Sequence, residues 1–228
     1  MIELITFFGI AFIFFSIPMA LLRFGKHWLI ALVPIYLITG NVFAESFFPI
    51  FGTFQDLATP IYSATFLITD MLSEHFSKED AKKAVFAGFL GLVIFAGATL
   101  IIVNAPILPD KIKIYKNVFS VLPRLVVGSF VAYIVSQTWD VFIYHRLKKI
   151  TGKKRLYLRN NISTITSQLL DTTIFVLIAF AGREPFSTKQ QIIVFILTTW
   201  AFKVAVALLD YPFILWSVKK IKLNKTIN

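Results

Sequence analysis

Residues 84–105 read AVFAGFLGLVIFAGATLIIVNA, a run without a single charged side chain. A helix needs about 20 mostly apolar residues to cross the hydrocarbon core of a bilayer. This run has that length and lacks the alternation of a barrel strand, so it predicts a transmembrane helix. The chain as a whole is 57% hydrophobic, with 25 phenylalanines among its 228 residues. A soluble domain would not carry so much apolar surface, and we therefore expect an integral membrane protein.

Six other windows have the length, or nearly the length, of a membrane span. They are residues 2–22, 28–44, 57–76, 122–144, 161–182 and 190–217. The second is short, and the last is interrupted by Lys203 and Asp210, with a bend expected at Pro212. No basic residue precedes the first run, so we expect it to be a retained span and not a signal peptide. The sequence predicts an all-α, polytopic transmembrane helical bundle with about seven spans, in a single domain over residues 1–228.

Lysine and arginine residues gather in alternate connections between these spans. Sixteen of the 23 lie after the first, third and fifth spans and in the C-terminal tail. Six lie on the other side, and Lys203 lies within a span. Because cytoplasmic loops carry the excess of basic residues, we expect the N-terminus outside and the C-terminus in the cytoplasm. An even number of spans would mix the two sets, so this asymmetry also favours seven.

The remaining composition excludes several classes of protein. The chain has no cysteine and only three histidines, which share no ligand-like spacing, so we expect no disulfide and no metal site. Its net charge of +11 lies at the ends of apolar runs, where it suits anionic lipid head groups better than nucleic acid. No phosphate-binding loop occurs, so we expect neither ATP hydrolysis by this chain nor a cofactor.

Acidic residues inside the predicted spans are the strongest functional signal. Asp70, Asp140, Asp171 and Asp210 lie in the third, fifth, sixth and seventh spans, and Glu74 lies one turn from Asp70. A central Asp costs about 2.5–3.5 kcal/mol to insert into a bilayer. We therefore expect these side chains to face the bundle interior or a water-filled cavity, as substrate-binding or proton-coupling groups.

A short motif occurs twice. Ser136-Gln137-Thr138-Trp139-Asp140 and Ser167-Gln168-Leu169-Leu170-Asp171 both read Ser-Gln-x-x-Asp. Helical spacing places the hydroxyl, amide and carboxylate of each motif on one face. The two predicted spans run antiparallel, so the two polar stripes are inverted, as is common at the binding sites of secondary transporters.

These groups indicate a small planar heterocyclic substrate. A carboxylate accepts two parallel hydrogen bonds from adjacent N–H and NH₂ groups, and a glutamine amide can meet both a carbonyl and a donor. Trp139, Tyr133 and several phenylalanines could stack on such a ring. Besides Gln137, Asp140, Gln168 and Asp171, the candidate site contains Asp70, Lys203 and Asp210. Secondary candidates are Glu74, Ser136, Ser167, Arg159, Asn160, Trp139 and Tyr133.

Structural roles compete with these functional ones. The two Ser-Gln-x-x-Asp motifs could simply join helices through hydrogen bonds. Lys203 could pair with Asp70 or Asp210, and Glu74 could lie at the cytoplasmic end. Arg159 and Asn160 could form an interfacial helix N-cap or could line a cytoplasmic vestibule.

Several stretches identify the chain as similar to the queuosine precursor transporter family, earlier named the vitamin uptake transporter (VUT) family. They are Leu67-Ile68-Thr69-Asp70 with Ser73-Glu74, Leu122-Pro123-Arg124, Ala132-Tyr133 through Asp140-Val141, Leu158-Arg159-Asn160-Asn161 through Asp171-Thr172, and Lys203-Val204 through Pro212-Phe213. They cover the third to seventh spans, whereas the first two spans match only loosely. The resemblance implies import of 7-cyano- or 7-aminomethyl-7-deazaguanine, which are salvaged to make queuosine in tRNA.

Three functions remain as alternatives. The resemblance favours a secondary-type transporter in the cytoplasmic membrane, driven by diffusion with metabolic trapping, by protons, or by both. The chain could instead be the substrate-binding subunit of an energy-coupling-factor importer with an ATP-hydrolysing partner. An intramembrane aspartyl enzyme is disfavoured, because the chain lacks both Tyr-Asp and Gly-x-Gly-Asp. Each of these three functions is compatible with a homo-oligomer.

Overall fold

The computed structural model describes residues 2–44, 46–50, 53–106, 122–152, 155–182 and 188–227. These residues form seven long helices: α1 (Ile2–Leu21), α2 (Lys26–Val42), α3 (Ala58–His75), α4 (Lys78–Asn104), α6 (Leu122–Thr151), α7 (Leu156–Ala179) and α8 (Lys189–Ile227). A 3-10 turn, η1 (Leu22–Phe24), follows α1, and the strands β1 (Phe47–Ile50) and β2 (Thr53–Asp56) form a hairpin between α2 and α3. The prediction of an all-α helical bundle is confirmed.

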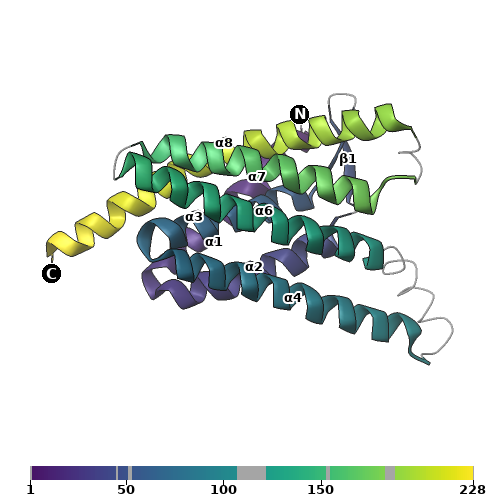
Figure 1. Ribbon diagram of the computed structural model, residues 1–228, viewed down its shortest axis with the longest axis horizontal. Helices are drawn as coiled ribbons and strands as arrows, with labels where there is room; N and C mark the ends of the chain where they lie inside the picture. The colour runs from purple at the N-terminus through teal and green to yellow at the C-terminus, as the bar shows by residue number, and fades with distance from the viewer. Residues whose placement is uncertain are drawn as a thin grey trace.

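The helices run side by side along the long axis of the molecule (Figure 1). The end that carries β1 and β2 is called the hairpin end; α2 ends there and α3 begins there. The other end, called the basic end, carries η1, the turn between α3 and α4 and the turn between α6 and α7, and the C-terminus extends from it. The sequence predicts that the hairpin end is outside the cell and that the basic end is cytoplasmic.

Five of the described helices, α1, α4, α6, α7 and α8, are long and apolar enough to cross a membrane. α2 has only 17 residues. α3 packs against α1, α2, α4, α6 and α8, and 15 of its 18 residues are buried. A helix enclosed by protein on every side does not need an apolar surface, which explains why α3 contains three Thr, two Ser and Asp70. The arrangement agrees with about seven spans.

The outer surface of the bundle is apolar. Phe86, Ile94, Ile101 and Ile193 are each more than half exposed. Large apolar patches on a protein surface mark a site of contact, and here the surrounding helices have the length of membrane spans. The surface therefore suits contact with lipid acyl chains.

Small residues let α4 approach its neighbours closely. A Cβ atom on Gly91 would lie 2.6 Å from Cβ of Pro34 in α2, and one on Gly88 would collide with the hydroxyl oxygen of Tyr133 in α6. The Pro34 ring is rigid, so position 91 requires glycine, whereas a larger residue at position 88 would displace the ends of the Tyr133 and Leu37 side chains. Close approach through small residues is the usual way in which membrane helices pack.

Several helix boundaries differ from the predicted spans. α4 begins at Lys78, before residue 84, with Ser77 Oγ accepting a hydrogen bond from the backbone N–H of Asp80 (3.1 Å) as its N-cap. α6 continues past residue 144, α7 begins at Leu156 and α8 continues past residue 217. Hydropathy locates the apolar part of a helix, whereas lysine and arginine are good helix formers and extend it beyond the membrane. The hairpin was not predicted either.

Candidate functional site

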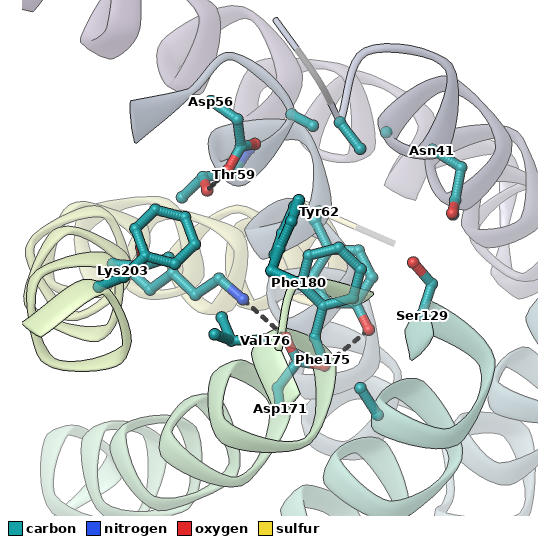
Figure 2. Close-up of a pocket in the computed structure, with 16 residues that line it drawn as sticks. Asn41, Asp56, Thr59, Tyr62, Ser129, Asp171, Phe175, Val176, Phe180 and Lys203 are labelled. Atoms are coloured by element: carbon teal, nitrogen blue, oxygen red, sulfur yellow. Dashed lines mark hydrogen bonds and ion pairs between the residues drawn. The ribbon is translucent and has the colours of Figure 1, made fainter. Parts of the chain in front are cut away.

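A cavity lies in the hairpin half of the bundle, between α2, α3, α6, α7 and α8 (Figure 2). Its empty volume, including its opening, is about 540 Å³. Aromatic side chains from three helices form much of its wall: Tyr62 of α3, Phe175 of α7 and Phe195 of α8, with Phe180 just past the end of α7. Pockets with mostly aromatic and apolar walls and a few polar groups are typical binding sites for small molecules.

Asp171 of α7 is a charged, buried group of the cavity wall. Its Oδ2 atom lies 2.6 Å from Nζ of Lys203 in α8, and its Oδ1 atom accepts hydrogen bonds from the hydroxyls of Tyr62 (2.8 Å) and Ser136 (3.1 Å). Both charged side chains are at most 6% exposed. The ammonium also lies 5.3 Å from the centre of the Tyr62 ring. Four helices therefore meet at one carboxylate.

The opposite wall of the cavity carries a second carboxylate, Asp56, the last residue of β2. It accepts hydrogen bonds from the backbone N–H of Thr59 (2.6 Å) and from the Thr59 hydroxyl (3.0 Å), which fixes the first turn of α3. Burial raises the pKa of Asp56, while the Lys203 charge and the Thr59 hydrogen bonds oppose that shift. The hairpin therefore places an acidic group beside the cavity.

Two buried polar atoms in the cavity wall have no hydrogen-bond partner within the described part of the chain. They are Oδ1 of Asn41, whose residue is 3% exposed, and Oγ1 of Thr199, whose residue is 5% exposed. An unpaired buried polar atom costs about 1–3 kcal/mol. Both atoms are thus available to a polar ligand.

The two Ser-Gln-x-x-Asp motifs bind each other. Ser136 of the first motif donates to Asp171 of the second (3.1 Å), and Ser167 of the second donates to Asp140 of the first (2.9 Å). This reciprocal pairing follows from the antiparallel packing of α6 and α7. The hydroxyls and carboxylates therefore join the two helices, and Asp171 in addition lines the cavity.

Asp140 and Asp70 come together deeper in the bundle, away from the cavity. The two carboxyl groups interact with each other, and Asp140 also interacts with Ser163. Thr164 donates to Asp70 at the longer distance of 3.4 Å. Two carboxylates that interact in the interior of a protein repel each other when both are ionised. The bundle therefore contains a pair of interacting acidic groups outside the cavity.

The two motif glutamines lie in different environments. Gln137 donates through Nε2 to the Thr65 hydroxyl (3.0 Å) and accepts through Oε1 from the Thr69 hydroxyl (3.2 Å). Gln168 is fully buried, and neither atom of its amide has a partner among the described residues. Gln137 therefore fixes α6 to α3, whereas the amide of Gln168 is free to bind another group.

A third cluster closes the basic end. Glu74 Oε2 lies 2.6 Å from Nη2 of Arg159 and 3.4 Å from Nζ of Lys148, and it accepts a hydrogen bond from the Tyr144 hydroxyl (2.9 Å). Lys148 also donates to the backbone carbonyl of Ser73 (2.6 Å). We call Glu74, Tyr144, Lys148 and Arg159 the basic-end cluster. It joins α3, α6 and α7 on the side away from the cavity.

The position of Arg159 corrects the expected interfacial N-cap. α7 begins at Leu156, and Arg155 occupies the N-cap position with a positive φ of 57°. Arg159 is therefore within the helix and is only 1% exposed, and Asn160 beside it is fully buried. Lys203 pairs with Asp171, and not with Asp70 as considered from the sequence.

The expected stacking residues also differ. Trp139 is 40% exposed on the outer surface, where its indole donates to the Thr166 hydroxyl (3.2 Å), and it does not line the cavity. Tyr133 is fully buried against Gly88 and is also outside the cavity lining. The side chain of Asp210 lies outside the described residues. The sequence analysis missed Tyr62, Asp56, Asn41 and Thr199, because none of them belongs to a motif.

Comparison with known proteins identifies the family. Residues 56–217 match the family described as "Putative vitamin uptake transporter". A Bacillus subtilis protein named "Probable queuosine precursor transporter" is 33% identical over 193 residues, which cover 83% of each chain. A Haemophilus influenzae protein of the same name is 27% identical over 55% of this chain and 52% of its own. No solved structure matches. The chain therefore belongs to the vitamin uptake transporter family and is a membrane transport protein.

Proposed function

We propose that this chain imports queuosine precursors, 7-cyano- or 7-aminomethyl-7-deazaguanine, across the cytoplasmic membrane. The relative from Bacillus subtilis, similar over most of both chains, is named "Probable queuosine precursor transporter". The observation that carries the proposal is the cavity, which combines aromatic walls with a carboxylate and with unpaired polar atoms. As a transporter, the chain would release its substrate chemically unchanged.

The cavity offers what a guanine-like base requires. Asp171 can accept hydrogen bonds from the N–H and NH₂ groups of the base once the Tyr62 and Ser136 hydroxyls give way. Oδ1 of Asn41 is a free acceptor, and the Thr199 hydroxyl can donate to a carbonyl oxygen. The aromatic side chains provide apolar surfaces for the ring.

A line of polar groups connects the cavity to the other end of the bundle. It follows α7, where Asp171, Ser167, Thr164 and Arg159 contact in turn Ser136, Asp140, Asp70 and Glu74 of the neighbouring helices. With the N-terminus outside, the cavity belongs to the outer half and the basic-end cluster closes the cytoplasmic half. This arrangement fits a transporter that faces outward and must separate Glu74 from Arg159 to release substrate inward.

Two driving forces fit this line. A proton carried by Asp70 or Asp140 would allow proton coupling, whereas facilitated diffusion with trapping inside the cell needs no such proton. Replacing Asp70 by Asn while measuring uptake with and without a proton gradient separates them. Uptake that keeps its full dependence on the gradient in this variant would remove the pair from a coupling role.

The test is salvage in a bacterium that can neither make nor import queuosine precursors. The strain would express this chain and receive nanomolar amounts of either base, and queuosine in tRNA would be measured. We expect restored queuosine with the wild-type chain and none with Asp171→Asn. Trp139→Phe, a change on the outer surface, is the matched control and should retain uptake.

Membrane quantities of each variant must be equal for this comparison. No queuosine from wild-type protein that is present in the membrane would contradict the proposal. Uptake that appears only on co-expression of an ATP-hydrolysing complex would instead support an energy-coupling-factor subunit.

A further inference from the structure

The cavity wall carries unequal numbers of acidic and basic groups. Three of its lining residues are charged: Asp56, Asp171 and Lys203. Figure 2 shows the two carboxylates on different walls, with the Lys203 ammonium directed at Asp171. With all three ionised, the wall has one negative charge in excess.

Lys203 forms an ion pair with one of the two carboxylates, Asp171. Its Nζ atom lies 2.6 Å from Asp171 Oδ2, and no ion pair joins it to Asp56 in the described chain. Asp56 accepts hydrogen bonds from the neutral backbone and hydroxyl groups of Thr59. The Lys203 charge acts on Asp56 from a distance, but no basic side chain of the described residues forms an ion pair with the Asp56 carboxylate.

Asp56 is half-buried. A carboxylate in a cavity wall that has no cation in contact attracts a cation that enters the site. The two proposed substrates differ in this respect. The 7-aminomethyl base carries a primary amine, which is protonated at neutral pH, like the amine of lysine. The 7-cyano base carries a neutral nitrile, which only accepts hydrogen bonds. A carboxylate can form charge-assisted hydrogen bonds with the ammonium but repels the nitrile nitrogen.

We propose that Asp56 is a specificity-determining residue that binds the cationic substituent of the substrate, so that the 7-aminomethyl base is preferred to the 7-cyano base. The proposal rests on the proposed import of these bases. In this arrangement Asp171 holds the polar edge of the base, and Asp56 holds the ammonium across the cavity. Bound substrate then neutralises the excess charge of the wall.

The experiment measures uptake of each labelled base, and competition between them, in cells that express the wild-type chain, Asp56→Asn or Thr59→Ala. Asparagine keeps an acceptor for the Thr59 backbone N–H but removes the charge. We expect wild type to take up the 7-aminomethyl base with an apparent affinity at least tenfold higher. Asp56→Asn should lose that preference through weaker uptake of the 7-aminomethyl base, with the 7-cyano base affected less than threefold.

Thr59→Ala is the matched control for a structural role. It removes the hydroxyl that contacts Asp56 (3.0 Å) while the carboxylate remains. We expect it to affect both bases equally and to keep the preference. Equal loss of the preference in Thr59→Ala and Asp56→Asn would show that helix capping, and not charge, is responsible.

Three other outcomes would overturn the proposal. A wild-type chain that prefers the 7-cyano base contradicts the assignment, and this comparison holds even if Asp56→Asn does not fold. Uptake of the 7-cyano base that requires Na⁺, and loses this requirement in Asp56→Asn, would assign Asp56 to a coupled cation. Failure of wild type to import either base would remove the proposed function itself, whereas import of both with equal affinity would remove only the role of Asp56.

Discussion

The pair formed by Asp171 and Lys203 gives the sharpest test of the cavity. Both side chains are almost fully buried, at 3% and 6% exposure, and their charged atoms are 2.6 Å apart. Removing one partner of a buried ion pair costs about 3–5 kcal/mol, because the other charge stays buried. Asp171→Asn should therefore destabilise the protein by about 3 kcal/mol, the lower end of this range, since the Tyr62 ring still faces the ammonium.

Lys203→Met should cost less, about 1–2 kcal/mol, because the Tyr62 and Ser136 hydroxyls still donate to the carboxylate. The double variant removes both charges. We expect its destabilisation to be smaller than the sum of the two single effects by about 2 kcal/mol, as for other residues in direct contact.

The assay is unfolding of detergent-purified protein by sodium dodecyl sulfate in mixed micelles, followed by the fluorescence of the four tryptophans. A difference of about 2 kcal/mol is about a 30-fold change in the unfolding equilibrium constant. Single effects that simply add in the double variant would refute the reasoning, because two side chains in contact as an ion pair cannot act independently.

The other predictions concern the basic-end cluster, the contact of α2 with α4, and the cavity tyrosine. Glu74→Gln should weaken the basic-end cluster. The chain has no cysteine, so a single cysteine in place of buried Ser73 can report this change, and it should react faster with a thiol reagent in the Glu74→Gln variant. An unchanged reaction rate would contradict this prediction. Gly91→Leu should lower stability by about 1–3 kcal/mol. Gly97→Leu should not, since no described atom lies within 4 Å of the place where a Cβ on Gly97 would be. Equal melting temperatures of the two variants would refute the close packing of Gly91 against α2. Tyr62→Phe, which removes a hydrogen bond to the cavity carboxylate worth about 1 kcal/mol, should reduce uptake by at most tenfold. Complete loss of uptake would assign that hydroxyl a direct role with substrate.

The helices could be predicted from the sequence because a bilayer allows few backbone conformations. An apolar run of this length must satisfy its own hydrogen bonds, so residues 84–105 could only be helical in a membrane. The same reasoning placed the buried aspartates inside the bundle, since exposure to lipid would cost several kcal/mol each. The repeated motif also indicated two inverted polar stripes. Because the two helices pack antiparallel, the serine of each stripe forms a hydrogen bond with the aspartate of the other.

The partners of those polar groups depended on tertiary structure. Tyr62 and Asp171 are 109 residues apart, and Lys203 is 32 residues from Asp171, so no local pattern relates them. Hydropathy also could not place Arg159 inside a helix, because the charge that ends an apolar run does not end the helix. The short hairpin that carries Asp56 has no periodicity to detect.

The sequence by itself therefore determined that this protein is a membrane-spanning bundle with carboxylates in its interior, since those properties follow from each segment and the bilayer around it. Only the tertiary structure decided which carboxylate faces the cavity, which one pairs with lysine and which two interact with each other. Those outcomes depend on the rotation and depth of each helix against its neighbours, which are set by packing between distant residues.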